Sequence, residues 1–244
     1  MKQILTAGLL ALLAACSGAA PAGAASLQVE PVRLSIPPKN SAAKITLRNS
    51  GAEQINAQVR IFKWTQVKGK EALVETRDVV ASPPIVKLDA AKSNVVRIVR
   101  TLKAPVAGEE AYRLIVDELP AAAGKTGLSI NFVLRYSIPV FFNSATQADP
   151  KLKWSVSAKG GQTVLTIANT GGTHMKLSGL AMAPKGGASV SFAKGLVGYV
   201  LANSTARFTF KQALKGASPG STVQITAEGN DAPVQAAAEV VAAN

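Results

Sequence analysis

The segment "TGLSINFVLRYSIPVFF" (residues 126–142) decides how this chain folds. Large apolar side chains occupy every second position: Leu128, Ile130, Phe132, Leu134, Tyr136 and Ile138. Because successive side chains of a strand point to opposite faces, this alternation predicts a β-strand with one apolar face. Pro139 has no N–H to donate to a ladder, which places it at an edge or an end of a sheet. The apolar face belongs either to the protein's own core or to a surface that meets a partner.

Strand and turn patterns extend over the rest of the chain. Alternating and β-branched stretches around residues 44–48, 55–64, 93–102 and 111–120 predict strands separated by turns, and no convincing helix pattern occurs. After residue 150 glycine becomes frequent and the predicted strands become shorter. This all-β pattern predicts two antiparallel β-sandwich domains, residues 26–145 and 146–244, behind a signal peptide at 1–25.

The N-terminal segment predicts export. Lys2 precedes an apolar run from Ile4 to Ala15, which is shorter than the about 20 residues of a membrane span but suits a secretory signal. Two cleavage sites compete. The run "AGAAS" (residues 22–26) favours cleavage after Ala24 or Ala25, whereas "LAAC" ends at Cys16 and resembles a lipoprotein box.

Composition narrows the function classes. The 244 residues are 48% hydrophobic and 17% charged, which suits a chain with a substantial core. Cys16 is the only cysteine, so no internal disulfide forms. The formal net charge of +13 fits nucleic acid, anionic lipid or an acidic protein, or simply a soluble basic surface. Aromatic residues make up only 5%, and basic residues are spread along strands, which argues against nucleic-acid binding.

No catalytic constellation is present in the sequence. His174 is the only histidine, and its position after a glycine-rich turn predicts a surface imidazole. Neither metal-ligand spacings nor a phosphate-binding loop with its lysine occur. We therefore expect no enzyme activity, no cofactor, no metal and no small-molecule substrate.

The order of several segments resembles a known family. These segments are "VEPVRLSI" (29–36), "ITLRNSG" (45–51), "ASPPIVKLDAAKSNVVRIVR" (81–100), "YRLIVDELP" (112–120) and "LSINFVLRYSIPVFF" (128–142). Together they resemble the first domain of periplasmic chaperones of the chaperone-usher pathway, and "RYSIPVF" is most similar to the archaic or another divergent branch. The resemblance implies two immunoglobulin-like domains in an L or boomerang arrangement.

The resemblance also implies a function for the apolar strand. A pilus or fimbrial subunit lacks its last strand, and the chaperone completes it with its own before delivery to an outer-membrane usher. The donor residues implied are Leu128, Ile130, Phe132 and Leu134. The protein is then a soluble periplasmic chaperone, with a lipoprotein anchored through Cys16 as the alternative location. The alternative function is a structural or adhesin-type two-domain sandwich at the cell surface.

Charged positions follow from the resemblance as well. Arg33 matches the first of two basic residues that hold the subunit's terminal carboxylate. The second is usually a lysine, but Ser137 stands at its position, and Arg135 on the same strand face is the candidate in its place. Arg97 and Glu118 match an internal ion pair near the domain junction.

Overall fold

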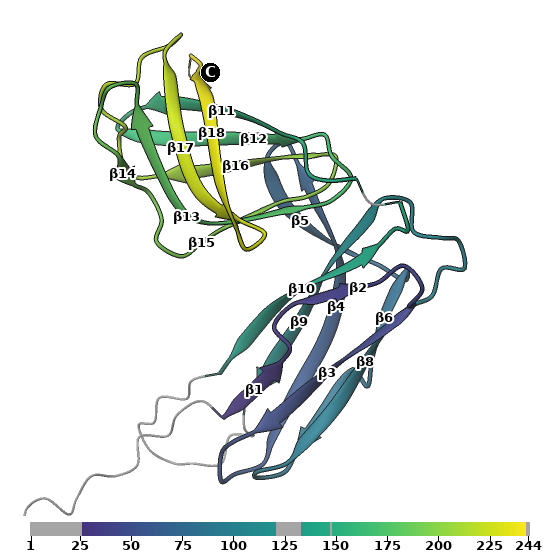
Figure 1. Cartoon of the computed structure of the whole chain (residues 1–244). Helices are drawn as coiled ribbons and strands as arrows, with labels where there is room; N and C mark the ends of the chain where they lie inside the picture. Colours follow the sequence, from purple (N-terminus) through teal and green to yellow (C-terminus); the bar gives the residue numbers. More distant parts are fainter. Residues whose placement is uncertain (1–25, 121–132, 147, 243–244) are drawn as a thin grey trace, which may run out of the picture.

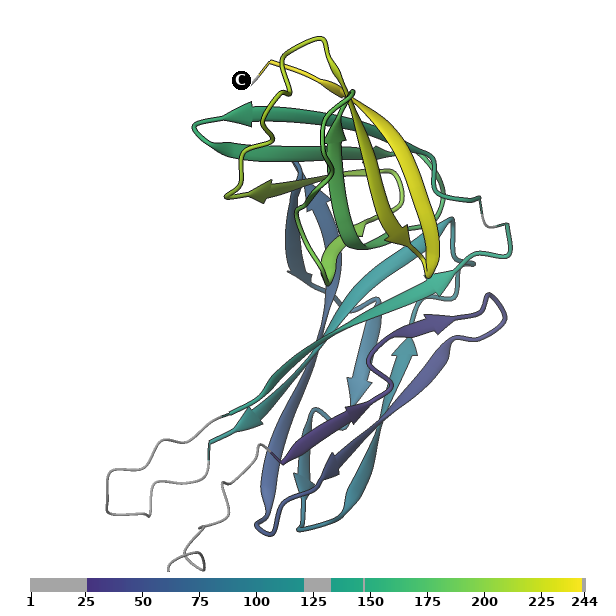
Figure 2. The ribbon, with the colours of Figure 1, turned by 60° about the vertical axis from the view of Figure 1, so that its left-hand side comes forward.

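Two β domains, inclined to one another, make up the protein (Figures 1 and 2). The computed structural model describes residues 26–120, 133–146 and 148–242. The predicted signal peptide and the predicted donor residues Leu128, Ile130 and Phe132 lie outside these residues. The described part of the chain contains strands and turns but no helix, so the predicted all-β class with two sandwich domains is confirmed.

The first domain packs two sheets face to face. Its four-stranded sheet has the order β1–β3–β8–β6, formed by β1 (Leu27–Glu30), β3 (Ala42–Asn49), β8 (Ser93–Arg100) and β6 (Val79–Ser82). Its other sheet has the order β2–β10–β9–β4–β5, with β7 on β4, and is formed by β2 (Leu34–Ile36), β10 (Arg135–Asn143), β9 (Glu109–Leu119), β4 (Ile55–Val67), β5 (Lys70–Glu75) and β7 (Ile85–Leu88).

The alternation read from the sequence places the core of this domain. In β8, Val96 and Ile98 are fully buried while Val95 and Arg97 face outward. In β10, the buried side chains of Ile138, Val140 and Phe142 belong to the same core. The C-terminal half of the apolar face at residues 126–142 is therefore this domain's own core.

The chain changes sheets between β1 and β2. Strand β1 pairs antiparallel with β3, whereas β2 runs parallel to β10, and the cis Glu30–Pro31 bond lies between them. A second cis bond, Ser82–Pro83, lies in the "SPP" turn. The sheet change leaves β2 only three residues long, so it covers only the end of β10.

The second domain folds one hydrogen-bonded sheet around its own core. Its order is β14–β13–β17–β18–β11–β12–β16, with β15 on β13. The strands are β11 (Leu152–Lys159), β12 (Gln162–Asn169), β13 (Met175–Pro184), β14 (Val190–Ser191), β15 (Leu196–Val200), β16 (Ser204–Phe210), β17 (Thr222–Gly229) and β18 (Ala232–Val240). The last strand of the first domain ends at Asn143, and the predicted boundary lies in the connection to Leu152.

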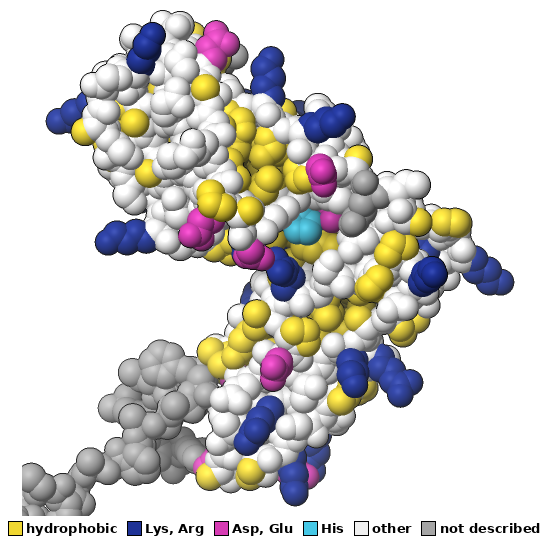
Figure 3. All heavy atoms as spheres, viewed as in Figure 1, with side chains coloured by type: hydrophobic (Ala, Val, Ile, Leu, Met, Phe, Trp, Pro, Cys, Tyr) yellow, Lys and Arg dark blue, Asp and Glu magenta, His cyan; other side chains and the backbone are white. Residues whose placement is uncertain are grey.

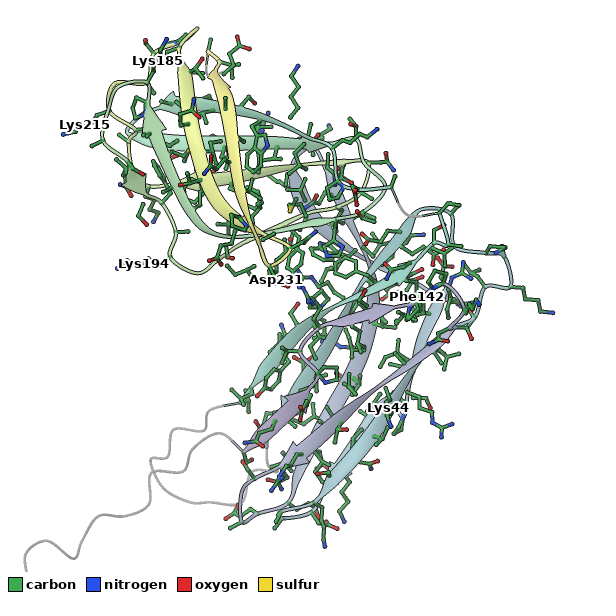
Figure 4. The ribbon with its side chains drawn as sticks, in the orientation of Figure 1. Lys44, Phe142, Lys185, Lys194, Lys215 and Asp231 are labelled. Atoms are coloured by element: carbon green, nitrogen blue, oxygen red, sulfur yellow. The ribbon has the colours of Figure 1, made fainter. Side chains whose placement is uncertain are left out.

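We predict that Phe142→Ala lowers the free energy of unfolding by about 3–5 kcal/mol, the usual result of emptying a buried aromatic site. Phe142, labelled in Figure 4, is 1% exposed. Its ring packs edge-on against Tyr112 with 5.9 Å between ring centroids. Urea unfolding measures the change. Val80→Ala is the control because Val80 is 42% exposed, and it should change stability by less than about 0.5 kcal/mol. Equal effects of both substitutions would contradict this placement of the core.

Candidate functional site

Strand β10 has one open edge. It pairs with β9 along its whole length, from Arg135 to Asn143, but β2 pairs with it only at Val140–Phe142. The Glu118 N–H donates to the Leu134 carbonyl, so by the alternation of an antiparallel ladder the backbone groups of Arg135 and Ser137 point away from β9. Among the described residues, no strand pairs with that side from Arg135 to Pro139.

The direction of β2 defines one arrangement for a strand added at this edge. A strand that extends the line of β2 along this edge runs parallel to β10. Its C-terminal end then stops where β2 begins, next to Arg33, the residue that precedes Leu34. An antiparallel strand would bring its amino end there instead. Arg33 is therefore placed to meet a carboxylate only if the added strand is parallel.

Arg33 of the first domain forms an ion pair with Asp231 of the second domain, across the hollow between them. Its guanidinium lies 3.5 Å from the Asp231 carboxylate, and the Lys176 Nζ lies 2.5 Å from the other oxygen of the same group. The hydrogen bond from Lys176 lowers the pKa of Asp231. Asp231 lies on the side of the second domain that faces the first (Figure 4). Figure 3 shows apolar side chains exposed along this hollow.

Arg135, the other predicted anchor, is bound to a carboxylate of the first domain. It donates to Asp117, which also accepts a 2.6 Å hydrogen bond from Arg60. Burial opposes ionisation of Asp117, yet the hydrogen bonds from Arg135 and Arg60 hold its pKa below the ordinary value. The parallel register sets Arg33 beside Pro139, and Arg135 precedes Pro139 by four residues, about 13 Å along a strand. The structure does not bring the two predicted anchors together.

Of the four predicted donor residues, the structure describes only Leu134. Its side chain is partly buried against the core of the first domain, and its N–H donates to the Glu118 carboxylate at 3.3 Å. On the opposite face, Val133 is 51% exposed. Leu134 is therefore the described donor candidate, and it packs at the border of the core of the first domain.

The predicted ion pair between Arg97 and Glu118 does not form. Arg97 is exposed on the outer face of β8, whereas Glu118 lies in β9 of the other sheet. The ion pair that forms, partly buried, is Arg100 with Glu110, joined by two hydrogen bonds of 2.8 Å. Arg100 shares the inward face of β8 with Val96 and Ile98. The alternation of this strand in the sequence could therefore have identified Arg100 as the inward-facing arginine.

His174 is not the surface imidazole that the sequence predicted. Its Nδ1 lies 2.7 Å from Glu109, whose other oxygen accepts the His174 N–H at 2.9 Å. The ring stacks on Phe141 with 3.6 Å between centroids. Glu109 and Phe141 belong to the first domain, so this contact joins the two domains.

A cluster of aromatic side chains extends this junction. Trp64 and Phe141 from the first domain pack with Tyr199 and Leu201 from the second. The Arg113 guanidinium lies 3.6 Å from the centre of the Trp64 ring, a cation–π contact. Sequence reasoning missed this junction because its members lie on strands far apart in the chain.

Polar backbone contacts fix the same junction. The Gln66 side chain donates to the Tyr199 carbonyl at 2.7 Å and accepts the Leu201 N–H at 3.0 Å. The Arg207 N–H donates to the Gly69 carbonyl at 2.9 Å, which docks the β4–β5 turn on β16. The second domain is thus held in place beside the end of β10.

Metal sites and membrane spans can also be assessed for the described part of the chain. Within the described residues, no group of three histidine, cysteine or carboxylate side chains is placed to hold a metal ion. No helix long and apolar enough to cross a membrane occurs among them either. The side-chain chemistry of the site is that of a strand edge with cations at its end.

Comparisons with known proteins identify the family. Residues 26–146 match the family model described as "Pili and flagellar-assembly chaperone, PapD N-terminal domain". A curated relative, the chaperone protein CssC of Escherichia coli, is 25% identical over 136 residues. That match covers 49% of this chain and only 56% of the relative's length.

Solved structures extend the likeness to both domains. A crystal structure of the CsuC–CsuE chaperone–tip adhesion subunit pre-assembly complex, from archaic chaperone-usher Csu pili of Acinetobacter baumannii, is 27% identical with a TM-score of 0.66. The match covers 90% of this chain and 100% of the other. The CupB2 chaperone of Pseudomonas aeruginosa, at 17% identity, shares the fold with a TM-score of 0.53 over 87% of this chain and 100% of that one. This chain belongs to the family of pilus-assembly chaperones of the chaperone-usher pathway.

We predict that Asp117→Asn destabilises the protein at pH 7 by about 1–3 kcal/mol, because two arginines lose a charged acceptor. A carboxyl whose folded pKa is lowered stabilises the fold above its unfolded pKa, and this contribution is lost as the pH falls through the folded value. The difference between wild type and variant should therefore shrink below about pH 4. Urea unfolding across this range is the measurement.

Asp89→Asn serves as the control for that experiment. Asp89 lies 4.0 Å from Lys87, and both side chains are more than 60% exposed. Its replacement should change stability by less than about 0.5 kcal/mol at either pH. A destabilisation by Asp117→Asn that stays constant between pH 7 and pH 3 would show that the carboxylate charge is not what holds the arginines.

Proposed function

We propose that this protein is an exported periplasmic chaperone that captures pilus or fimbrial subunits by donor-strand complementation and delivers them to an outer-membrane usher. The observation that carries the proposal is the open edge of β10 from Arg135 to Pro139. The apolar alternation continues from this edge through Leu128, Ile130 and Phe132. A subunit that lacks a strand would gain both a hydrogen-bonded edge and apolar side chains.

The number of apolar donors is sufficient for capture. A large apolar side chain that becomes fully buried contributes about 1.5–3 kcal/mol, so three or four supply on the order of 5–12 kcal/mol before the costs of association. The related CsuC–CsuE structure is itself a complex of a chaperone with a tip adhesion subunit. This likeness supports the same kind of partner for the present chain.

The proposed mechanism uses no catalysis and no cofactor. The bound subunit leaves when another subunit's strand replaces the borrowed one, so the exchange of one strand for another drives release. Chaperones of the chaperone-usher pathway are periplasmic, and the apolar run at Ile4–Ala15 supports export of this one. In this proposal Arg33 is the cation that meets the terminal carboxylate of the subunit.

We expect co-expression with a pilin subunit that aggregates alone to yield a soluble one-to-one complex, and Phe132→Asp to abolish it, because a carboxylate would enter an apolar groove. Size-exclusion chromatography with light scattering measures the complex. Val95→Asp is the matched control, since Val95 is 42% exposed on the outer face of β8, and the complex should survive it. A complex that also survives Phe132→Asp would exclude strand donation at this position. An adhesin-type protein would leave the pilin aggregated in both cases.

Signal cleavage after Ala24 or Ala25 is part of this proposal, because a chaperone must diffuse from its subunits to the usher. The intact mass of the mature protein should equal that of a chain that begins at Ala25 or Ser26. A mass that corresponds to a chain beginning at a lipid-modified Cys16 would instead assign an anchored lipoprotein.

A further inference from the structure

The cations beside the open edge of β10 already hold a carboxylate. Asp231 lies between the Arg33 guanidinium, at 3.5 Å, and the Lys176 Nζ, at 2.5 Å. Arg33 makes no other ion pair among the described residues. The group that these two cations recognise in the free protein is therefore a carboxylate, and it comes from the protein itself.

Asp231 is held in place by the turn that carries it. Asn230 and Asp231 form the turn between β17 and β18, with φ angles of 47° and 68°. The Asn230 side chain accepts the Lys176 N–H at 2.9 Å and donates to the His174 carbonyl at 3.0 Å. These contacts fix the turn to the start of β13, which also carries Lys176. The backbones of Lys176 and Asp231 are thus fixed to each other, whereas the Asp231 side chain is 63% exposed.

The contact between Asp231 and Arg33 is easily exchanged. The two side chains are 63% and 43% exposed, and exposed ion pairs contribute little because water screens them. The junction around Trp64, Phe141 and Tyr199 does not depend on this pair. Exchange of one carboxylate for another would therefore leave the domains joined and the number of paired charges unchanged.

We propose that Arg33 and Lys176 form a two-cation carboxylate site, that Asp231 occupies it in the free protein, and that the terminal carboxylate of a strand added parallel to β10 displaces Asp231. The proposal rests on the proposed function, because it assumes that a strand pairs with this edge. It assigns the second cation to Lys176 of the second domain, in place of Arg135, which Asp117 holds. It also makes Asp231 a competitor of the incoming strand.

If Asp231 is a competitor, Asp231→Asn should strengthen binding of the added strand, which is unusual for the loss of an ion pair. Removal of an interdomain ion pair ordinarily weakens a function that depends on domain arrangement, whereas removal of a competitor strengthens binding. Asparagine tolerates the positive φ of residue 231, so the turn should persist. The neighbouring contacts of Asn230 remain in this variant.

The test uses an acetylated eight-residue peptide of alternating threonine and valine, prepared with a free C-terminal carboxylate and as its C-terminal amide. Binding to the mature protein is followed by NMR titration of the backbone amides. We expect the acid peptide to bind more tightly than the amide. Asp231→Asn should tighten binding of the acid peptide by about two- to fivefold, as expected for loss of one exposed ion pair, and leave the amide unchanged.

Variants of the two cations complete the test. Arg33→Gln should remove the preference for the acid peptide, and Lys176→Gln should reduce it. Lys194→Gln, at an exposed lysine elsewhere on the second domain (Figure 4), should have no effect. Two results overturn the carboxylate site without affecting strand addition. The first is that Asp231→Asn binds the acid peptide no more tightly than wild type does, and the second is that Arg33→Gln keeps the full preference for the acid peptide. Failure of both peptides to shift the Arg135 and Ser137 amides overturns strand addition at this edge, and the carboxylate site with it.

Discussion

The structure depends on strand β10, whose two faces and one edge are packed or paired, while part of its other edge is open. The side chains of Ile138, Val140 and Phe142 in β10 are buried in the core of the first domain, with Tyr136 partly buried against it, and β9 pairs with one edge of β10 throughout. On the other face, Phe141 packs into the junction with the second domain. Only the edge from Arg135 to Pro139 remains without a partner in the described part of the chain. A strand fixed in this way offers a rigid edge, so a partner that pairs with it does not have to order it first.

The change of sheet at residues 31–33 creates this opening. If β1 continued along β10, its backbone would cover the edge, and the fold would be closed. Because the chain instead pairs first with β3 and later with β10, the edge is covered only at Val140–Phe142. The same change of sheet brings Arg33 to the end of the open segment. The free edge and the cation at its end therefore have one structural cause.

The two domains are coupled through the same strand. His174 stacks on Phe141 and binds Glu109, which pairs with Asn143 in the ladder of β9 and β10. These contacts hold the second domain, with Lys176 and Asp231, beside the end of β10. The domain arrangement thus sets which charges face an added strand.

The sequence predicted those features that depend on short-range patterns. Alternation located β10 and the buried faces of the first domain, and the order of motifs pointed to Arg33 and to the family. Features that depend on contacts across the fold were missed. His174 follows a glycine-rich turn, and nothing in its neighbourhood reveals Glu109. The ion pair was assigned to Arg97 and Glu118 because these positions match the family motif. The alternation along β8 points instead to Arg100, which lies on the inward face of the strand. Asp231 could not be recognised as a partner of Arg33, since a turn of the other domain supplies it.

Hydrogen exchange at the two open-edge amides tests the central claim most directly. In the free protein the N–H groups of Arg135 and Ser137 should exchange fast, while those of Tyr136 and Ile138, which face β9, should exchange slowly. In a one-to-one complex with a pilin subunit, the Arg135 and Ser137 amides should become protected to a similar degree. A stable complex in which these two amides still exchange as fast as in the free protein would contradict strand addition at this edge.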